Sequence, residues 1–225
     1  MFGIKHKVSM IILLAVLFIM TNSLGVFAAT DFGEFAYWYS DSSQISYFNL
    51  SSINTIKYKF TGFDMSQTNF DTCTNNAINS WFSAVGLSNT YVTDQSKAQI
   101  EVFGFSRADA NGYGVPSNAG GVTAFDSTRL GTATFAGSTK YVNKIIPTVH
   151  VYFAWDTGSK YNTGNFTLTQ WKQVFAHELG HAIGYEGHYN NTTGSSLMYA
   201  TTGALFNQTI TTPSTLDKNH MHNPY

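Results

Sequence analysis

Three of the chain's seven histidines lie in one short stretch, HELGHAIGYEGH at residues 177 to 188, with Glu178 between the first two. His177 and His181 are four residues apart, so on a helix both imidazoles would lie on one face, one turn apart. Two neutral imidazoles at this spacing can bind a zinc ion at about 2.0–2.1 Å. Glu178 would lie about 100° round the helix, close to the ion but not aimed at it. The pattern predicts a metal site with a carboxylate beside it.

The combination of a metal ion and a neighbouring carboxylate suits hydrolysis. Zinc lowers the pKa of a bound water to roughly 7, and a nearby carboxylate can accept a proton as that water attacks a carbonyl and then deliver it to the leaving amine. The alternative is a helix whose two histidines are only solvated or bonded in the core. We favour the metal, because the motif coincides with a capped amphipathic helix, a strand before it and a glycine after it.

A third metal ligand is needed. A glutamate from a later helix is excluded, because no glutamate follows Glu186. The remaining candidates are His188, Glu186, Asp217, His220 and His222. His188 is favoured, because Gly184 would let the chain reverse and bring the residues past the turn back toward the metal.

The helix that carries the motif has clear boundaries. Thr167 and Gln170 have the spacing of a capping box, in which each residue's side chain accepts the other's backbone N–H. Apolar residues then recur every three or four positions and form a buried face, namely Leu168, Trp171, Phe175, Leu179 and Ala182. The sequence predicts a helix from about Leu168 to Ile183 that ends at Gly184.

The other elements alternate between strands and helices. Alternating and β-branched patterns predict strands at 53–60, 97–106, 120–127 and 146–156, and a Gly-, Asn- and Asp-rich loop at 107–119. An amphipathic helix is predicted at 69–86, with Cys73, the only cysteine, on its apolar stripe. No internal disulfide can form, and we expect a buried thiol.

HELGHAIGYEGH followed by SSLMYA resembles the zinc-binding stretch and Met-turn of the metzincin proteases, and is most similar to the catalytic domain of the matrixins, including small secreted bacterial members. The resemblance covers nearly all of the chain after residue 28 in element order. It implies an α+β fold with a twisted, mostly parallel sheet and an antiparallel edge strand. Two long helices and a short C-terminal helix near Ser214 to Asp217 complete the expected fold.

The resemblance also implies roles for individual residues. Zinc would be bound by His177, His181 and His188, with Glu178 as general base. Met198 would form the hydrophobic floor under the metal, although alone it would be taken as ordinary core. The edge strand that receives the substrate backbone would contain Gly121, Val122, Thr123 and Ala124. Tyr199 and Ala200 would help to form the wall of the pocket for the side chain after the scissile bond.

The sequence departs from the matrixin pattern at two places. In HExxHxxGxxH the third histidine would fall at Gly187, and His188 comes one residue later. Glycine tolerates the unusual backbone angles of a local bulge, so we expect His188 to bind rather than Glu186, Asp217 or a water.

The second departure concerns further metals. The structural zinc of animal matrixins would need a histidine near Thr123 or Ala124, so we expect one catalytic zinc, no second zinc, and a strand histidine at His150. Calcium is weakly indicated: Asp109, Asp126 and Asp156 lie in or beside loops without a dense run of oxygen ligands.

Residues 1–28 have the features of a secretory signal peptide. Lys5 and Lys7 precede an apolar run at 11–20 that is too short to span a bilayer, and Val26-Phe27-Ala28 suits signal peptidase. The alternative is an uncleaved anchor. Residues 29–225 would then form one secreted, extracellular catalytic domain. The formal net charge of −1 gives no basis for binding nucleic acid, and we expect a monomer without membrane attachment once the signal is removed.

Three hypotheses follow. The leading one is a secreted zinc metalloendopeptidase that hydrolyses peptide bonds in extended protein substrates. The second is a secreted binding module with the same fold, in which the displaced His188 impairs catalysis. The third is a zinc hydrolase that acts on a different amide. The depth of the specificity pocket depends on loop conformation, so the sequence predicts neither the natural substrate nor the cleavage specificity.

Overall fold

A computed structural model describes residues 44–47, 50–116, 119–135, 138–155, 166–185, 187–189 and 194–221. The chain divides into two units, Met1–Asp31 and Phe32–Tyr225, and all described residues belong to the second. The predicted signal peptide lies outside the described residues, as do Asp156, Glu186 and His222. Among the helices described, none combines the length and apolar character needed to cross a membrane.

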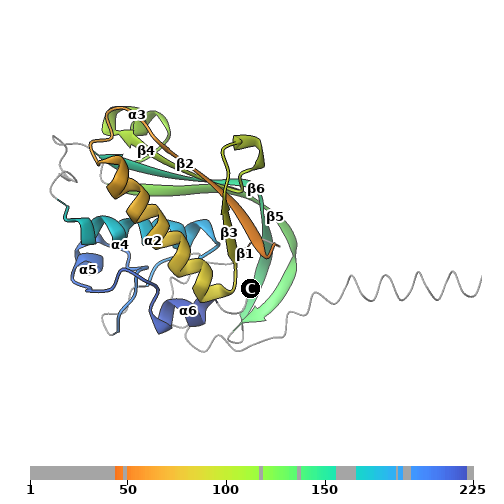
Figure 1. Ribbon diagram of the computed structural model, residues 1–225. Coiled ribbons are helices and arrows are strands. Elements are labelled where there is room, and N and C mark those ends of the chain that lie inside the picture. Colours follow the sequence, from red (N-terminus) through yellow and green to blue (C-terminus); the bar gives the residue numbers. More distant parts are fainter. Residues whose placement is uncertain are drawn as a thin grey trace, which may run out of the picture. The chain divides into compact units, whose positions relative to one another are not determined.

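The described strands form one sheet (Figure 1). Five of them are parallel, in the order β1 (Gln44–Tyr47), β6 (Ser138–Trp155), β4 (Ile100–Ser106), β2 (Ser52–Lys59) and β3 (Ser88–Tyr91). β5 (Gly121–Phe135) pairs with β6 in the antiparallel direction. The predicted fold class, a mostly parallel sheet with an antiparallel edge strand, is confirmed.

Two long helices cover one face of the sheet, α2 (Gln67–Val85) and α4 (Leu168–Ala182) (Figure 1). Alternate residues of the central strands join the helix side chains in the main hydrophobic core, among them Ile53, Val102, Val151, Phe153, Trp81, Phe175 and Leu179. Cys73 lies in this core and is confirmed as a buried thiol. Burial raises the pKa of its side chain to about 12.

The predicted helix boundaries are accurate where capping signals exist. Thr167 Oγ1 accepts a hydrogen bond from the Gln170 amide at 3.2 Å, and Gln170 Oε1 accepts one from the Thr167 amide at 2.8 Å. The predicted capping box is therefore confirmed, and α4 begins at Leu168. The predicted short C-terminal helix is α6 (Thr215–Met221).

Three sequence predictions need correction. The predicted loop at 107–119 starts with a helix, α3 (Arg107–Gly112), because Ser106 accepts a hydrogen bond from the Asp109 amide at 3.2 Å and caps it. The predicted strands at 120–127 and 146–156 are the paired ends of the longer β5 and β6. The short elements β1, β3, η2 (Gln95–Lys97) and α5 (Thr202–Phe206) were not predicted.

Candidate metal centre

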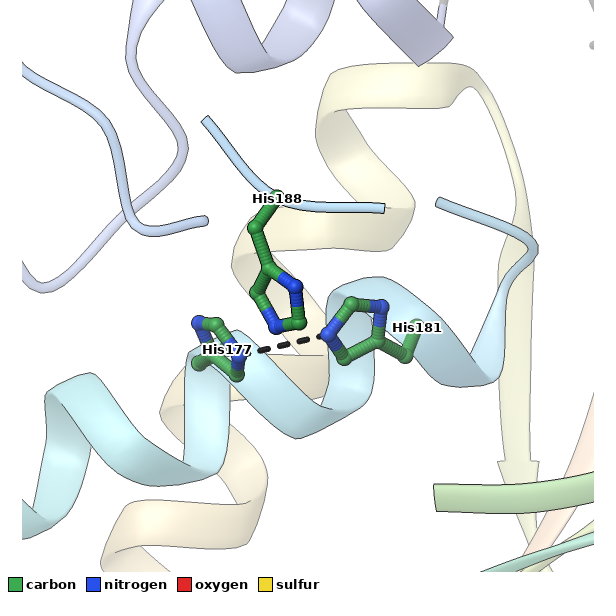
Figure 2. A group of neighbouring side chains, drawn as sticks. All are labelled: His177, His181 and His188. Carbon is green, nitrogen blue, oxygen red and sulfur yellow. Dashed lines mark hydrogen bonds between the residues drawn. The ribbon is translucent and has the colours of Figure 1, made fainter. Parts of the chain in front are cut away.

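The end of α4 and the segment after it bring three imidazole rings together (Figure 2). His177 and His181 project from successive turns of α4, and His188 reaches them after a reversal of the chain. One ring nitrogen from each of the three lies within 4.8 Å of the others. Both glycines of the reversal have positive φ, 104° at Gly184 and 77° at Gly187. A β-carbon would be strained in these conformations, and they let His188 turn toward the helix.

The hydrogen bonds of the first two rings fix their tautomers. His177 Nδ1 donates to the Leu197 carbonyl at 2.8 Å, and His181 Nδ1 donates to the Tyr185 carbonyl at 2.6 Å. A carbonyl oxygen can only accept, so both protons lie on Nδ1 and both neutral rings carry a lone pair on Nε2. These two Nε2 atoms lie 3.2 Å apart.

Two lone pairs at this distance repel each other unless a cation lies between them. A tetrahedral zinc site with Zn–N bonds of 2.0–2.1 Å would place its nitrogens roughly 3.3 Å apart, close to the observed spacing. The Nδ1 bonds to carbonyl oxygens are the outer interactions that usually orient metal-binding imidazoles. The donor set and its arrangement therefore fit a zinc ion.

The protonation states of the three imidazole rings favour metal binding as well. Burial lowers the pKa of His177 well below its ordinary value, and the nearby rings of His181 and His188 lower it further. Burial and the neighbouring His188 lower the pKa of His181 to about 4, and burial also lowers the pKa of His188. All three rings are therefore neutral near pH 7, which is the form that binds metal.

Glu178 follows His177 on α4, and its side chain is held by β5. Its side chain is only 9 % exposed, and burial raises the pKa of its carboxyl to about 7, against the opposing effect of a hydrogen bond from Thr123. Thr123 Oγ1 is 2.9 Å from Glu178 Oε2 and 2.8 Å from the Glu178 main-chain oxygen. A β-carbon at Gly121 would lie 2.9 Å from Glu178 Cγ. Thr123 and Gly121 thus form the surface against which Glu178 lies.

The turn around Met198 holds one of the three imidazole rings in place. Leu197, in this turn, supplies the carbonyl that accepts the hydrogen bond from His177 Nδ1. Asp217 on α6 accepts hydrogen bonds from the Leu197 amide at 3.0 Å and the Ser196 hydroxyl at 2.5 Å, and the Met198 amide donates to that hydroxyl at 2.9 Å. Asp217 is fully buried. It therefore fixes the turn rather than joining the three histidines.

Met198 packs against the glycine between the two helical histidines. A β-carbon at Gly180 would lie 2.7 Å from Met198 Sδ and 2.8 Å from Trp81 Cζ2. Trp81 comes from α2, and its indole N–H donates to the Ala176 carbonyl on α4 at 2.6 Å. The helix that carries His177 and His181 is therefore in close contact with α2 on one side and the turn on the other.

The remaining predicted site residues differ in their surroundings. Val122 packs against a smaller apolar cluster that includes Phe103, Phe105 and Val115, on the opposite face of the sheet from α4, and Ala124 is exposed. Tyr199 is 7 % exposed and donates its hydroxyl proton to the Gly194 carbonyl at 2.7 Å. Ala200 is exposed. The segment after His188 is joined to the turn, because the Tyr189 amide donates to the Met198 carbonyl at 2.6 Å.

Comparison with known families gives the decisive observation: the family model described as matrixin matches residues 49–225. The chain belongs to the matrixin family. Matrixins are zinc metallopeptidases, so this matrixin has a metallopeptidase-type domain, which agrees with the fold and with the three converging histidines. No curated protein matches the chain significantly.

Two contributions to the site were missed by sequence reasoning. The side chain of Thr123 was not expected to bond with Glu178, because a strand pattern gives no register relative to a helix. Asp217, a candidate ligand from the sequence, contacts the turn instead, and a pattern of metal-binding residue types gives no sign of that contact. The Ser214–Asp217 spacing is a partial signal, since the Asp217 amide donates to Ser214 Oγ at 3.1 Å as an N-terminal cap predicts.

Proposed function

We propose that this matrixin is a secreted zinc endopeptidase that cleaves extended segments of proteins. The observation that carries the proposal is the pair of Nε2 lone pairs on His177 and His181, 3.2 Å apart, with the His188 ring close to them and Glu178 as the next residue after His177 on the same helix. This arrangement favours a cation and places a base next to it. Among the described residues, no other group of three or more metal-binding side chains is found.

Each residue of the site has a role in this proposal. His177, His181 and His188 would hold the zinc ion. When bound, zinc would lower the pKa of a coordinated water to about 7 and polarise the scissile carbonyl. Glu178 would take the proton from the attacking water on a carboxylate oxygen and return it to the leaving nitrogen. Without metal, burial raises the pKa of this carboxyl to about 7; a bound cation would lower it, so the carboxylate form that accepts a proton would be present near neutral pH.

The substrate would bind along β5. Among the described residues β5 pairs only with β6, so its other edge can accept an extended peptide as an additional strand through main-chain hydrogen bonds. Gly121, Val122, Thr123 and Ala124 lie on this strand beside Glu178. We propose that Tyr199 and Ala200 border the pocket for the side chain after the scissile bond.

Metal analysis and cleavage of a broad peptide library test the proposal together. The protein secreted without residues 1–28 should contain one zinc per chain and cleave library peptides at internal bonds. Glu178→Gln keeps the size of the side chain but cannot act as a base, so it should retain zinc and lose roughly 10²–10⁴-fold in kcat. A Glu178→Gln variant as active as the wild type would exclude the proposed mechanism.

The same experiment separates the other hypotheses. A binding module with impaired catalysis would bind zinc and leave the whole library intact in its wild-type form. That hypothesis depended on a displaced third histidine, whereas His188 lies with the other two rings (Figure 2). A hydrolase for a different amide would also leave the library intact, and would be found by its activity on non-peptide amides. N-terminal sequencing of the exported protein tests the cleavage expected after Ala28.

A further inference from the structure

The hydroxyl of Thr123 lies between two oxygens of one residue. Both acceptors within hydrogen-bond distance belong to Glu178: the carboxylate Oε2 at 2.9 Å and the main-chain oxygen at 2.8 Å. Thr123 is on β5, and Glu178 is on α4, 55 residues further along the chain. The contact therefore joins the edge strand to the helix at the position of the predicted base.

This contact defines the orientation of the Glu178 side chain. The hydroxyl has one proton, which the two acceptors share: the main-chain oxygen, fixed by the helix, holds the hydroxyl in place at 2.8 Å, and the hydroxyl in turn holds Oε2 at 2.9 Å. With Oε2 held by Thr123, Oε1 is the oxygen available to a reacting water.

The rest of β5 restricts the same side chain. Gly121, two residues before Thr123 and on the same face of the strand, lies against Glu178 Cγ, because a β-carbon there would lie at 2.9 Å. Phe153 of β6 fills the adjacent space, with its ring 2.9 Å from the same β-carbon position. The side chain of Glu178 is thus bounded on this side, and Thr123 supplies the only polar contact with its carboxylate among the described residues.

We propose that Thr123 is a positioning residue for the Glu178 carboxylate, and that it couples the substrate-binding edge strand to the base. The inference rests on the proposed peptidase function. A peptide that adds to β5 would bind to the backbone of the strand whose side chain orients the base. Docking of the substrate and alignment of the base then depend on one strand.

The alternative is that Thr123 serves only as a strand former, because β-branched residues fit a pleated surface. Thr123→Val keeps the branched shape and removes the hydroxyl, and Thr123→Ser keeps the hydroxyl and removes the methyl group. If Thr123 positions the carboxylate, the Ser variant should be more active than the Val variant. If Thr123 is only a strand former, the Val variant should be at least as active as the Ser variant. Thr148→Val is a matched control on β6, since it also removes a side-chain hydrogen bond to a main-chain oxygen, that of Ala98 at 3.2 Å.

The experiment measures kcat and KM on a library peptide for the zinc-loaded wild type and the three variants. Misalignment of a reacting group by about 1 Å can cost 10²-fold, so Thr123→Val should lose about 10- to 100-fold in kcat. Its KM should stay within about twofold, since the backbone that binds substrate is retained. Thr123→Ser should recover most of the activity, and Thr148→Val should match the wild type. All four proteins should contain equal zinc.

A structural measurement that does not depend on enzymatic activity completes the test. In crystal structures of the same proteins, the Glu178 carboxylate should keep its position in the Ser variant and leave it in the Val variant. An unchanged carboxylate in Thr123→Val, or a Val variant more active than the Ser variant, overturns the positioning role. If the wild type cleaves no peptide, the proposed function fails, and the position of the carboxylate in these crystal structures alone decides the role of Thr123.

Discussion

Substituting Gly180 by alanine should destabilise the protein, although the change usually stabilises a helix. Gly180 lies inside α4 between His177 and His181. In an open helix, Gly→Ala gains about 0.8–1.0 kcal/mol. Here the new β-carbon would lie 2.7 Å from Met198 Sδ and 2.8 Å from Trp81 Cζ2. Carbon atoms prefer a separation of about 3.5 Å or more, so α4 would have to move about 0.7 Å away from Trp81.

The neighbours cannot easily make room. Trp81 is fully buried, and its indole is bonded to the Ala176 carbonyl at 2.6 Å, so a shift of the ring also breaks this hydrogen bond. Met198 is flexible but fully buried. Overpacking of this kind costs about 1–3 kcal/mol. Two contacts below 3 Å put this site in the upper half of that range, about 2–3 kcal/mol, so after subtraction of a helical gain of about 1 kcal/mol we expect a net loss of about 1–2 kcal/mol.

Thermal unfolding with excess zinc and with chelator measures this effect. A loss of this size should lower Tm by about 2–8 °C for a domain of this length. Movement of α4 also shifts His177 and His181 relative to His188, so zinc affinity should fall about tenfold or more. Gly203→Ala is the matched control: it lies in α5, is exposed, and its β-carbon would meet no atom within 4 Å. That variant should be neutral or slightly stabilised.

The reasoning fails if Gly180→Ala unfolds at or above the wild-type temperature and binds zinc as tightly. Such a result would mean that α2 and the Met198 turn adapt to a helix one methyl group wider. A Tm that falls equally in both glycine variants would also contradict it, because only Gly180 faces a crowded surface.

Further predictions follow from other contacts. Asp217→Asn leaves one carboxamide oxygen for donors that now bond to two carboxylate oxygens, so chemical denaturation should show a loss of about 1–3 kcal/mol; an unchanged midpoint would count against its role in the turn. The pKa of His181 is lowered to about 4 from 6.5, so the unfolded chain binds its proton more tightly. In a Glu178→Gln background, which removes the opposing effect of the raised Glu178 pKa, the metal-free protein should be most stable above pH 6.5 and lose stability as the pH falls toward 4; a midpoint that stays level across this range would refute the assignment. Chelators should abolish peptide hydrolysis and added zinc should restore it; activity that persists after zinc is shown to be absent excludes the metal. Cys73, with its pKa raised to about 12, should react with a disulfide reagent only on unfolding, and rapid labelling of the native protein would contradict its burial.

The sequence was most informative where local signals determine structure. The capping box at Thr167, the apolar stripe of α4 and Gly184 fixed the helix that carries the motif to within one residue. The spacing of His177 and His181 followed from helix geometry alone. His188 could be favoured because Gly184 allows the chain to reverse and Gly187 permits a positive φ, and the structure has φ of 104° and 77° at these two glycines.

Prediction was weakest where long-range pairing determines structure. The strands β1 and β3, QISY and SNTY, are short and largely polar, so their own sequences do not predict strands. They form because β1 pairs with β6 and β3 pairs with β2. The hydroxyl of Thr123 and the carboxylate of Asp217 act across 55 and 20 residues of sequence. Such contacts depend on how helices and strands pack against one another, and the hydrophobic periodicity of the chain does not predict that packing.

The hydrogen bond from the Tyr189 amide to the Met198 carbonyl has a thermodynamic consequence for cation uptake. It anchors the backbone next to His188 to the same turn whose carbonyl orients His177. Little conformational entropy then remains to be lost when the three rings close on an ion. The affinity of the three histidines for a cation should therefore depend mainly on the strength of the metal–nitrogen bonds and on desolvation. Loss of this hydrogen bond should make the entropy of metal binding less favourable, as measured by calorimetry.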